Sequence, residues 1–138
     1  SYTDSGDLED RVGSVALTRS AEARGITVPE GTLVTAHDII SMAENGDAVA
    51  AEMTDEILDM VSMALAAMSV ILDPEAIVVG SGISSDANRI IPQLQERLDG
   101  RIIRVPRLLP SVLGDDGVLL GVAELAINEL DAVDFVPR

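Results

Sequence analysis

The chain has 138 residues, enough for one domain with a hydrophobic core but short for two ordinary domains. It contains no Cys, no Lys and one histidine, His37. This inventory excludes disulfides, zinc–cysteine sites, Schiff bases, a P-loop lysine and multi-histidine metal clusters. The net charge is −15, and residues 1–75, with 15 acids and 3 Arg, carry −12 of it. Such a surface repels DNA phosphates and anionic lipids, so we expect no nucleic-acid or membrane partner for this chain.

The first third of the chain predicts two helices. Apolar residues at spacings of three and four predict a helix over residues 7–23. Thr35 followed by Asp38 is typical of a capping box, which predicts a second, short helix over residues 36–44. Asn45-Gly46 is a suitable stop for that helix.

The longest predicted element follows Asp47, which is placed to cap it. Its apolar stripe is broad, as in a helix that lies at the centre of a domain, and Pro74 ends it. The stripe repeats every three or four residues through Val49, Met53, Ile57, Val61, Leu65, Met68 and Leu72.

The second half of the chain alternates strands and helices. We predict strands at 76–80 and at 101–105, the second stopped by Pro106. A helix is predicted over 86–98, divided at Pro92, and a final helix over 116–130. This order indicates an α/β domain.

A glycine turn in "IVVGSGIS", residues 77–84, joins the first strand to a helix. Strand, Gly-x-Gly and helix form the general geometry of phosphate sites, because glycine lets backbone N–H groups approach the ligand. The third glycine of a dinucleotide fingerprint is missing, since Ser85 stands in its place. The turn is therefore either a nucleotide corner or only a tight bend.

Gly117 and Gly121, four residues apart, indicate close packing of the last helix, with contact to the sheet favoured over contact to a ligand.

Three stretches resemble the C-terminal half of ROK proteins (repressor, open reading frame, kinase). They are "ILDPEAIVVGSGIS", "SVLGDDGVLLGVAELAI" and "SGDLED". The resemblance implies one ribonuclease H-like lobe of an actin-like ATPase or sugar kinase fold, with helices packed on a mostly parallel sheet. Residues 1–138 would form this single C-terminal lobe, with the N-terminal lobe and any helix-turn-helix lying outside the chain. ROK proteins commonly pair through this half, so a homo-oligomer is expected.

The resemblance also assigns site residues. Glu9 would accept hydrogen bonds from sugar hydroxyls, although a glutamate in a first helical turn can also simply complement the helix dipole. Gly80, Ser81 and Gly82 would border the adenosine side of a nucleotide. Two positions depart from the family pattern. Asp7 replaces a zinc-binding cysteine whose partner would fall near Tyr2, so no zinc is expected, and Ser81 replaces the middle glycine of the turn.

Three functions follow from these residues. The departures favour the effector-binding and oligomerising half of a sugar-responsive transcriptional regulator, with a sugar or sugar phosphate as ligand and no required cofactor. The alternative is the nucleotide-binding lobe of a sugar kinase that uses ATP, and the third is an interaction domain without a ligand.

In each case we expect a cytoplasmic protein, and no catalysis by this chain alone, because the family's catalytic base lies in the other lobe. Arg101, Arg104 and Arg107 are expected to pair with acidic helices or to lie in a subunit interface.

Overall fold

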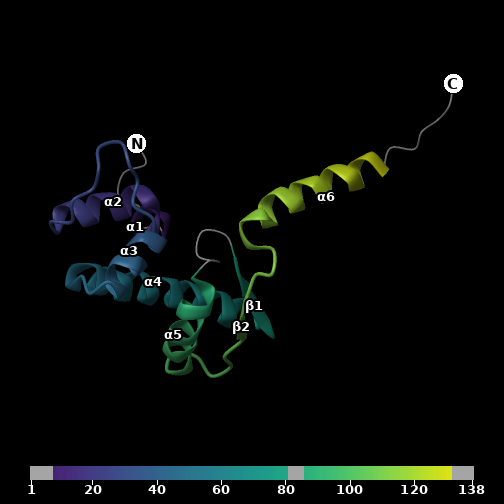
Figure 1. Cartoon of the computed structure of the whole chain (residues 1–138). Coiled ribbons are helices and arrows are strands. Elements are labelled where there is room, and N and C mark those ends of the chain that lie inside the picture. Colours follow the sequence, from purple (N-terminus) through teal and green to yellow (C-terminus); the bar gives the residue numbers. More distant parts are fainter. Residues whose placement is uncertain (1–7, 81–85, 132–138) are drawn as a thin grey trace, which may run out of the picture.

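The computed structural model describes residues 8–80 and 86–131, in which helices pack beside a two-stranded sheet (Figure 1). The helices and strands are α1 (Glu9–Val12), α2 (Ser14–Ala23), α3 (Ala36–Glu44), α4 (Ala48–Leu72), β1 (Ala76–Val79), α5 (Ala87–Asp99), β2 (Arg107–Pro110) and α6 (Gly117–Asp131). None of the helices in these residues is long and apolar enough to cross a lipid bilayer. The α/β class and the parallel sheet expected from the sequence are confirmed.

The predicted first helix is in fact two helices. Gly13 adopts an extended conformation, with φ −69° and ψ 152°, between α1 and α2. Glycine lowers helix propensity by about 1 kcal/mol relative to alanine, which makes this a weak point in a helical pattern. After this break, Leu17 and Ala21 form the buried face of α2, and Val15 is exposed.

The predicted caps of α3 and α4 are confirmed. The Thr35 hydroxyl accepts from the Asp38 backbone N–H at 3.2 Å, and the Asp38 carboxylate accepts from the Thr35 N–H at 2.8 Å. The Asp47 carboxylate accepts from the Ala50 N–H at 2.9 Å and starts α4. α4 then runs for 25 residues until Asp73 takes a left-handed conformation, with φ 45°.

Two apolar clusters both include residues of α4. The first cluster is formed by Leu17, Ala21, Val34, Ile39, Ala50, Met53 and Ile57. The second is formed by Ile40, Leu58, Leu65, Ile90, Leu94, Leu98 and Leu108. α3 also contributes to both clusters through Ile39 and Ile40, so α3 and α4 together join the N-terminal helices to the sheet region.

The second strand lies later in the chain than predicted. β2 begins at Arg107, after Pro106, and pairs in parallel with β1 from Ala76↔Arg107 to Val79↔Pro110. The predicted strand at 101–105 is wrong. The Arg101 and Ile102 N–H groups bond the Leu98 carbonyl and close α5 in a turn. This segment instead serves to bring charged side chains back to α4.

Two of the three arginines around this turn form ion pairs with α4 and the residue that ends it. Arg101 contacts Asp59 at 3.1 Å, and Arg104 contacts Asp73 at 2.5 Å. The expectation that these arginines pair with acidic helices is therefore confirmed for Arg101 and Arg104.

Pro92 does not divide α5. The helix is continuous from Ala87 to Asp99 with Pro92 inside it. Proline removes one helical hydrogen bond, yet tertiary packing routinely overrides local propensity. Here Ile90, Leu94 and Leu98 form a fully buried stripe against α4, and that burial holds the helix in one piece.

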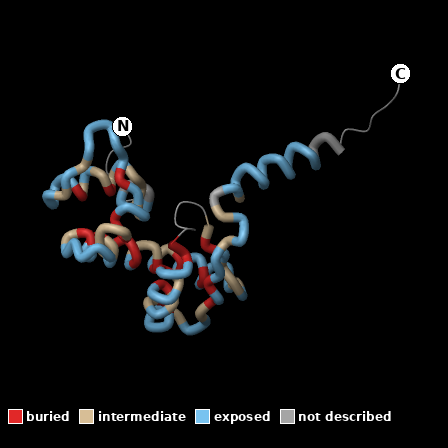
Figure 2. The backbone as a smooth tube through the Cα atoms, viewed as in Figure 1, coloured by how far each residue is buried: buried red, intermediate tan, exposed pale blue. Residues whose placement is uncertain are grey.

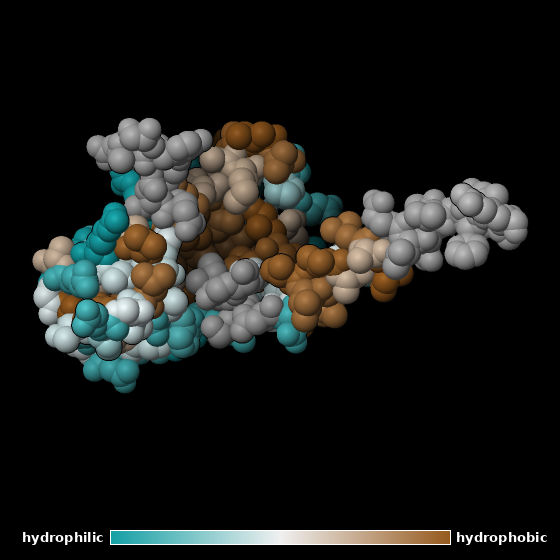
Figure 3. All heavy atoms as spheres, turned by 90° about the horizontal axis from the view of Figure 1, so that it is seen from above, coloured by the Kyte–Doolittle hydropathy of each residue, from teal (hydrophilic) through white to brown (hydrophobic). Residues whose placement is uncertain are grey.

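α6 projects away from the rest of the molecule (Figures 1 and 2). Apolar surface covers it and continues into the hollow at its base (Figure 3). Its exposed apolar residues are Val118, Leu119, Leu120, Val122, Leu125 and Ile127. The expected contact of Gly121 with the sheet is not found among the described residues, because a Cβ added there meets nothing within 4 Å. One face of the sheet is also uncovered at Val78, which is 63% exposed.

Candidate nucleotide and sugar site

The carboxyl ends of both strands meet at one edge of the sheet. Gly80 follows β1 and Ser111 follows β2, and the Ser111 N–H donates to the Val79 carbonyl at 2.8 Å. A Cβ built on Gly80 would lie 3.2 Å from the Ser111 Cβ, so only a glycine fits here without displacing its neighbour. Ligands of open α/β sheets bind outside this edge. The structure thus places Gly80 at the carboxyl end of β1, as the sequence predicted, and its role in nucleotide binding stays a prediction.

The other two residues predicted for this corner, Ser81 and Gly82, lie outside the described residues. The description resumes at Asp86, the residue before α5, whose side chain is completely buried. His37 Nδ1 lies 2.7 Å from one oxygen of this carboxylate, and Arg89 bonds the other oxygen. Arg89 also pairs with Glu44 on α3. We call Glu44, Arg89, Asp86 and His37 the Asp86 network.

The amino-acid sequence does not predict this network. An acid just before a helix is common as a cap, so Asp86 gave no reason to look for a partner on α3. As the single histidine of the chain, His37 indicates no multi-histidine metal site and gives no other functional signal. The available signal was a lone histidine in the first turn of a well-capped helix, and it does not identify a partner 49 residues away.

The loop after β2 closes the same edge of the sheet. The Leu113 N–H donates to the Ser111 hydroxyl at 3.2 Å, and Gly114 has a positive φ of 54°. A single 3-10 turn over Gly114–Asp116 then leads into α6. A Cβ on Gly117 would lie 3.4 Å from the Leu113 Cβ, an ordinary van der Waals distance, so the described residues do not show the close packing predicted at Gly117.

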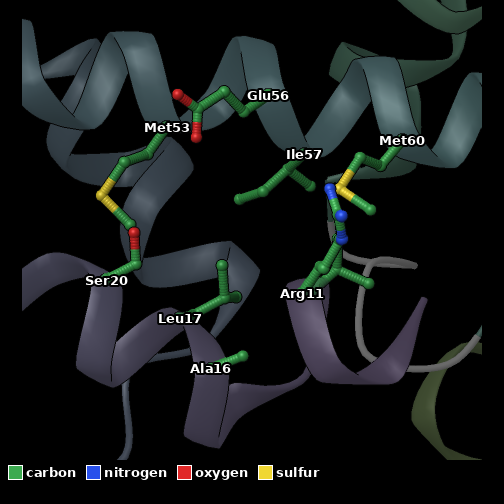
Figure 4. Close-up of a pocket in the computed structure, with 9 residues that line it drawn as sticks. Arg11, Ala16, Leu17, Ser20, Met53, Glu56, Ile57 and Met60 are labelled. Carbon is green, nitrogen blue, oxygen red and sulfur yellow. The ribbon is translucent and has the colours of Figure 1, made fainter. Parts of the chain in front are cut away.

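The predicted sugar residue, Glu9, is the first residue of α1, and its side chain lies outside the described residues. Arg11 and Val12, at the end of α1, border a pocket of about 270 Å³ between α1, α2 and α4 (Figure 4). Leu17, Met53 and Met60 give the pocket apolar walls. Arg11 and Glu56 lie on either side of Ile57 in Figure 4.

The negative charge of Glu56 in this pocket is paired with Arg24, which lies outside the pocket. The Glu56 carboxylate accepts from Arg24 at 2.7 Å. This hydrogen bond raises the pKa of the Arg24 guanidinium. Glu56 is thereby tied to α2, so the pocket keeps Arg11 and Ser20 as polar groups that a ligand could contact.

Glu9 and Gly80 belong to different parts of the molecule. α1 packs on the first cluster through Val12, whereas β1 packs on the second through Ile77. α4 lies between them (Figure 1). A second pocket, of about 430 Å³, lies between residues 26–34 and α3 and includes His37 in its wall.

Metal ligands do not gather within the part of the chain that the structure describes. No group of three or more His, Cys, Asp or Glu residues there could hold a metal ion. Asp7 and Tyr2, which stand where the family's zinc ligands would fall, lie outside that part. The absence of zinc therefore stays a prediction.

The fold is that of sugar kinases of the actin-like ATPase class. The structure superimposes on a ROK family glucokinase from Streptomyces griseus, solved with glucose and AMPPNP, with a TM-score of 0.68 and 25% identity over 88% of this chain and 45% of that one. A ROK hexokinase from Thermus thermophilus shares the fold, with a TM-score of 0.68 and 24% identity over 90% of this chain and 42% of that one.

Sequence comparison places the chain in a family. Residues 5–129 match the profile of the ROK family, and the chain belongs to that family. It is 34% identical to the N-acetyl-D-glucosamine kinase of Escherichia fergusonii over 97 residues. These residues make up 68% of this chain and 32% of that protein. The corresponding kinase of Aliivibrio salmonicida is 35% identical over 94 residues, 66% of this chain and 31% of that protein. The chain thus spans about a third of the length of these relatives.

Proposed function

We propose that this chain is the C-terminal, nucleotide-binding lobe of a ROK sugar kinase that transfers a phosphoryl group from ATP to a hexose or N-acetylhexosamine. The observation that carries the proposal is the contact of Gly80 with Ser111 at the carboxyl edge of the sheet. Gly80, the first residue of the glycine turn, thereby lies at the edge where ligands bind in this kind of sheet. The similarity to N-acetyl-D-glucosamine kinases and to a glucokinase solved with AMPPNP supports the same assignment.

The proposal gives each predicted site residue a role. Gly80, Ser81 and Gly82 border the adenosine side of the nucleotide, and Glu9 accepts hydrogen bonds from the sugar. Phosphoryl transfer also needs a base and groups that clamp the phosphates. We place these in a second lobe that this chain does not include, so residues 1–138 alone form one lobe and do not turn over substrate.

The regulator reading that the sequence favoured is not what we propose. It depended on Asp7 and Ser81, two departures from the family pattern. Serine adds a small side chain to the turn and leaves its backbone N–H groups in place, so it is compatible with a bound nucleotide. The relatives named above are sugar kinases, and they favour the kinase reading.

Sugar, ATP and a second copy of the protein are the partners that the proposal names, and the cytoplasm, where ATP is available, is the compartment. The strongly acidic charge of −15 supports the expectation that this chain contacts neither nucleic acid nor membrane.

The test is a coupled assay for ADP release by the parent protein, with N-acetyl-D-glucosamine, glucose and other hexoses. We expect turnover with at least one of these sugars and background rates for the isolated 138-residue chain. Glu9→Gln should lower kcat/KM for the sugar by about 10-fold or more, since a hydrogen bond to a charged group contributes about 1.5–3 kcal/mol. Glu22→Gln, an exposed substitution on α2, is the control and should leave the rate unchanged. A parent protein that is folded but inactive on every sugar would refute the proposal.

A further inference from the structure

The second pocket, of about 430 Å³, lies apart from both candidate sites. It is bordered by residues 26–34 and by α3, and its lining includes no residue of α1 or of the strands. All of its lining residues belong to the described part of the chain. Its volume falls within the range of about 300–1,000 Å³ that is usual for small-molecule sites. The pocket is therefore a candidate site in its own right.

The two sides of this pocket differ in chemistry. The loop contributes a mainly apolar wall with Ile26, Val28, Pro29, Leu33 and Val34. α3 contributes a polar face, because His37, Ser41 and Asn45 follow one another at intervals of four residues. The Asn45 side-chain N–H donates to the Ser41 carbonyl at 2.8 Å, so the Asn45 side-chain oxygen is left as an acceptor. A ligand that fits this pocket has an apolar body and one polar end that donates hydrogen bonds.

The ring of His37 is held from outside the pocket. Its Nδ1 lies 2.7 Å from the carboxylate of Asp86, whose side chain is 0% exposed and also bonds Arg89. A buried carboxylate paired in this way is ionised and only accepts hydrogen bonds, so Nδ1 carries the proton. In the neutral ring Nε2 is then an acceptor. Because the His37 side chain is 49% exposed and lines the pocket, Nε2 is the ring nitrogen left for a ligand.

Asp38 gives the pocket a negative charge. Hydrogen bonds from Thr35 lower the pKa of the Asp38 carboxyl, so this group is ionised at neutral pH. The bonds from the Thr35 N–H and hydroxyl both go to Oδ2, which leaves Oδ1 to accept from a ligand. No arginine lines the pocket among the described residues, and the chain has no lysine. The pocket therefore attracts cations and repels anions.

We propose that this pocket is a binding site for a small organic cation, with an ammonium or related N–H group on an apolar body. The cationic group donates to His37 Nε2 and to the Asp38 carboxylate, and the body packs on the apolar wall that the loop forms. The site requires only residues 26–45 and the Asp86 network that fixes the His37 ring. It does not depend on the proposed kinase function.

Binding is measured by NMR titration of the ¹⁵N-labelled 138-residue chain at neutral pH. The probe is phenethylamine, with phenylacetate as an anion of similar size and phenylethanol as the uncharged analogue. Phenethylamine should cause saturable shifts of amides in residues 26–45, with a millimolar Kd, as is usual for a ligand of this size. Phenylethanol should bind about threefold to tenfold more weakly, and phenylacetate should not bind measurably. The absence of saturable shifts with phenethylamine would refute the site.

The ring of His37 supplies a second signal, because it is the single histidine of the chain. In the free chain its ¹⁵N spectrum should show a protonated Nδ1 and an unprotonated Nε2. Phenethylamine should shift the Nε2 signal, since this nitrogen accepts a hydrogen bond in the complex. A ring protonated on both nitrogens, or an Nε2 signal that phenethylamine leaves unchanged, would overturn the proposal.

Three variants separate charge from shape. Asp38→Asn removes the charge and should lower the affinity for phenethylamine to that for phenylethanol. Glu30→Gln removes a charge from the same loop at a position that does not line the pocket, so this control should change the Kd by less than about twofold. Ser41→Leu places a larger apolar side chain in the pocket and should abolish binding while the cap of α3 and the Asp86 network stay in place. Equal binding of all three compounds, binding that survives Ser41→Leu, or shifts centred on the pocket beside Arg11 would contradict the proposal.

Discussion

Thr35 and Asp38 show how a pair of neighbouring side chains starts a helix. The hydrogen bonds that Thr35 donates from its hydroxyl and its backbone N–H lower the pKa of the Asp38 carboxyl. A carboxyl whose pKa is lowered by folding stabilises the folded state above its unfolded pKa, and this contribution is lost as the pH falls through the folded pKa. The contribution of the Asp38 carboxylate to the cap is therefore present at neutral pH and lost in acid.

Thr35→Ala should lower the free energy of unfolding by about 1 kcal/mol at pH 7, the usual cost of losing an N-cap side chain. The difference from wild type should shrink at acidic pH, where Asp38 is protonated in both proteins. Urea unfolding at a series of pH values measures both effects, with Thr32→Ala in the exposed loop as control. A difference independent of pH would show that Asp38 has no part in the cap.

Gly80 is held in place by its close approach to Ser111. Gly80→Ala puts a Cβ 3.2 Å from the Ser111 Cβ, so one of the two strands' ends must shift. Overpacking of this kind typically costs about 1–3 kcal/mol, and we expect the lower end for one methyl group.

The contact can be checked by a double-mutant cycle in urea unfolding. Gly80→Ala should be less harmful in a Ser111→Gly background, which removes the opposing Cβ. Ser111→Ala keeps that Cβ and is the control, and there Gly80→Ala should cost as much as in wild type. Equal costs in all three backgrounds would refute the steric explanation.

At the scale of the element, α6 differs from the other long helices. α4 and α5 each bury a stripe of large side chains, whereas every α6 residue from Val118 to Asn128 is exposed. An isolated helix of this length is marginal in water, so helix propensity weighs heavily in its stability.

Gly121→Ala should stabilise α6 in the isolated chain by about 1 kcal/mol, because an added Cβ meets no neighbour and alanine favours the helix. Circular dichroism should show more helix, or a helix that melts at higher temperature. Ala123→Gly, at another exposed position, should have the opposite effect. Destabilisation by Gly121→Ala would mean that something packs closely against this position.

At the scale of the whole molecule, apolar surface is exposed in three neighbouring places. They are α6, the outer face of the sheet around Val78, and the last turn of α4 at Val70, Ile71 and Leu72. Large exposed apolar patches mark surfaces that bind another protein or protein segment. Salt bridges from Arg97 to Asp55 and Asp59 tie α5 to α4 on a different, charged side of the molecule.

The isolated chain should therefore self-associate, and light scattering at micromolar concentration should report a dimer or larger species. Leu119→Glu combined with Val122→Glu places two charges on α6 and should shift the equilibrium toward monomer. Asn128→Glu adds charge near the end of α6 and is the control. A wild-type chain that stays monomeric at high concentration would contradict this expectation.

The sequence by itself was sufficient to locate α3, α4, β1 and α6 and to assign the chain to its family. Those features depend on local signals: side-chain caps, apolar spacing, a proline after a helix and a glycine turn. The same signals placed Gly80 at the end of a strand, and the structure confirms that position. These local signals did not predict the break at Gly13, because the apolar spacing stays regular on both sides of it.

Tertiary structure alone decided the rest. The strand begins at Arg107 because residues 101–104 turn back to reach acids near α4. Pro92 stays inside α5 because a buried stripe outweighs one missing hydrogen bond. Asp86 meets His37 across 49 residues of chain. Each of these outcomes depends on the energy of contacts between residues far apart in sequence, and those energies exist only once the elements have packed against one another.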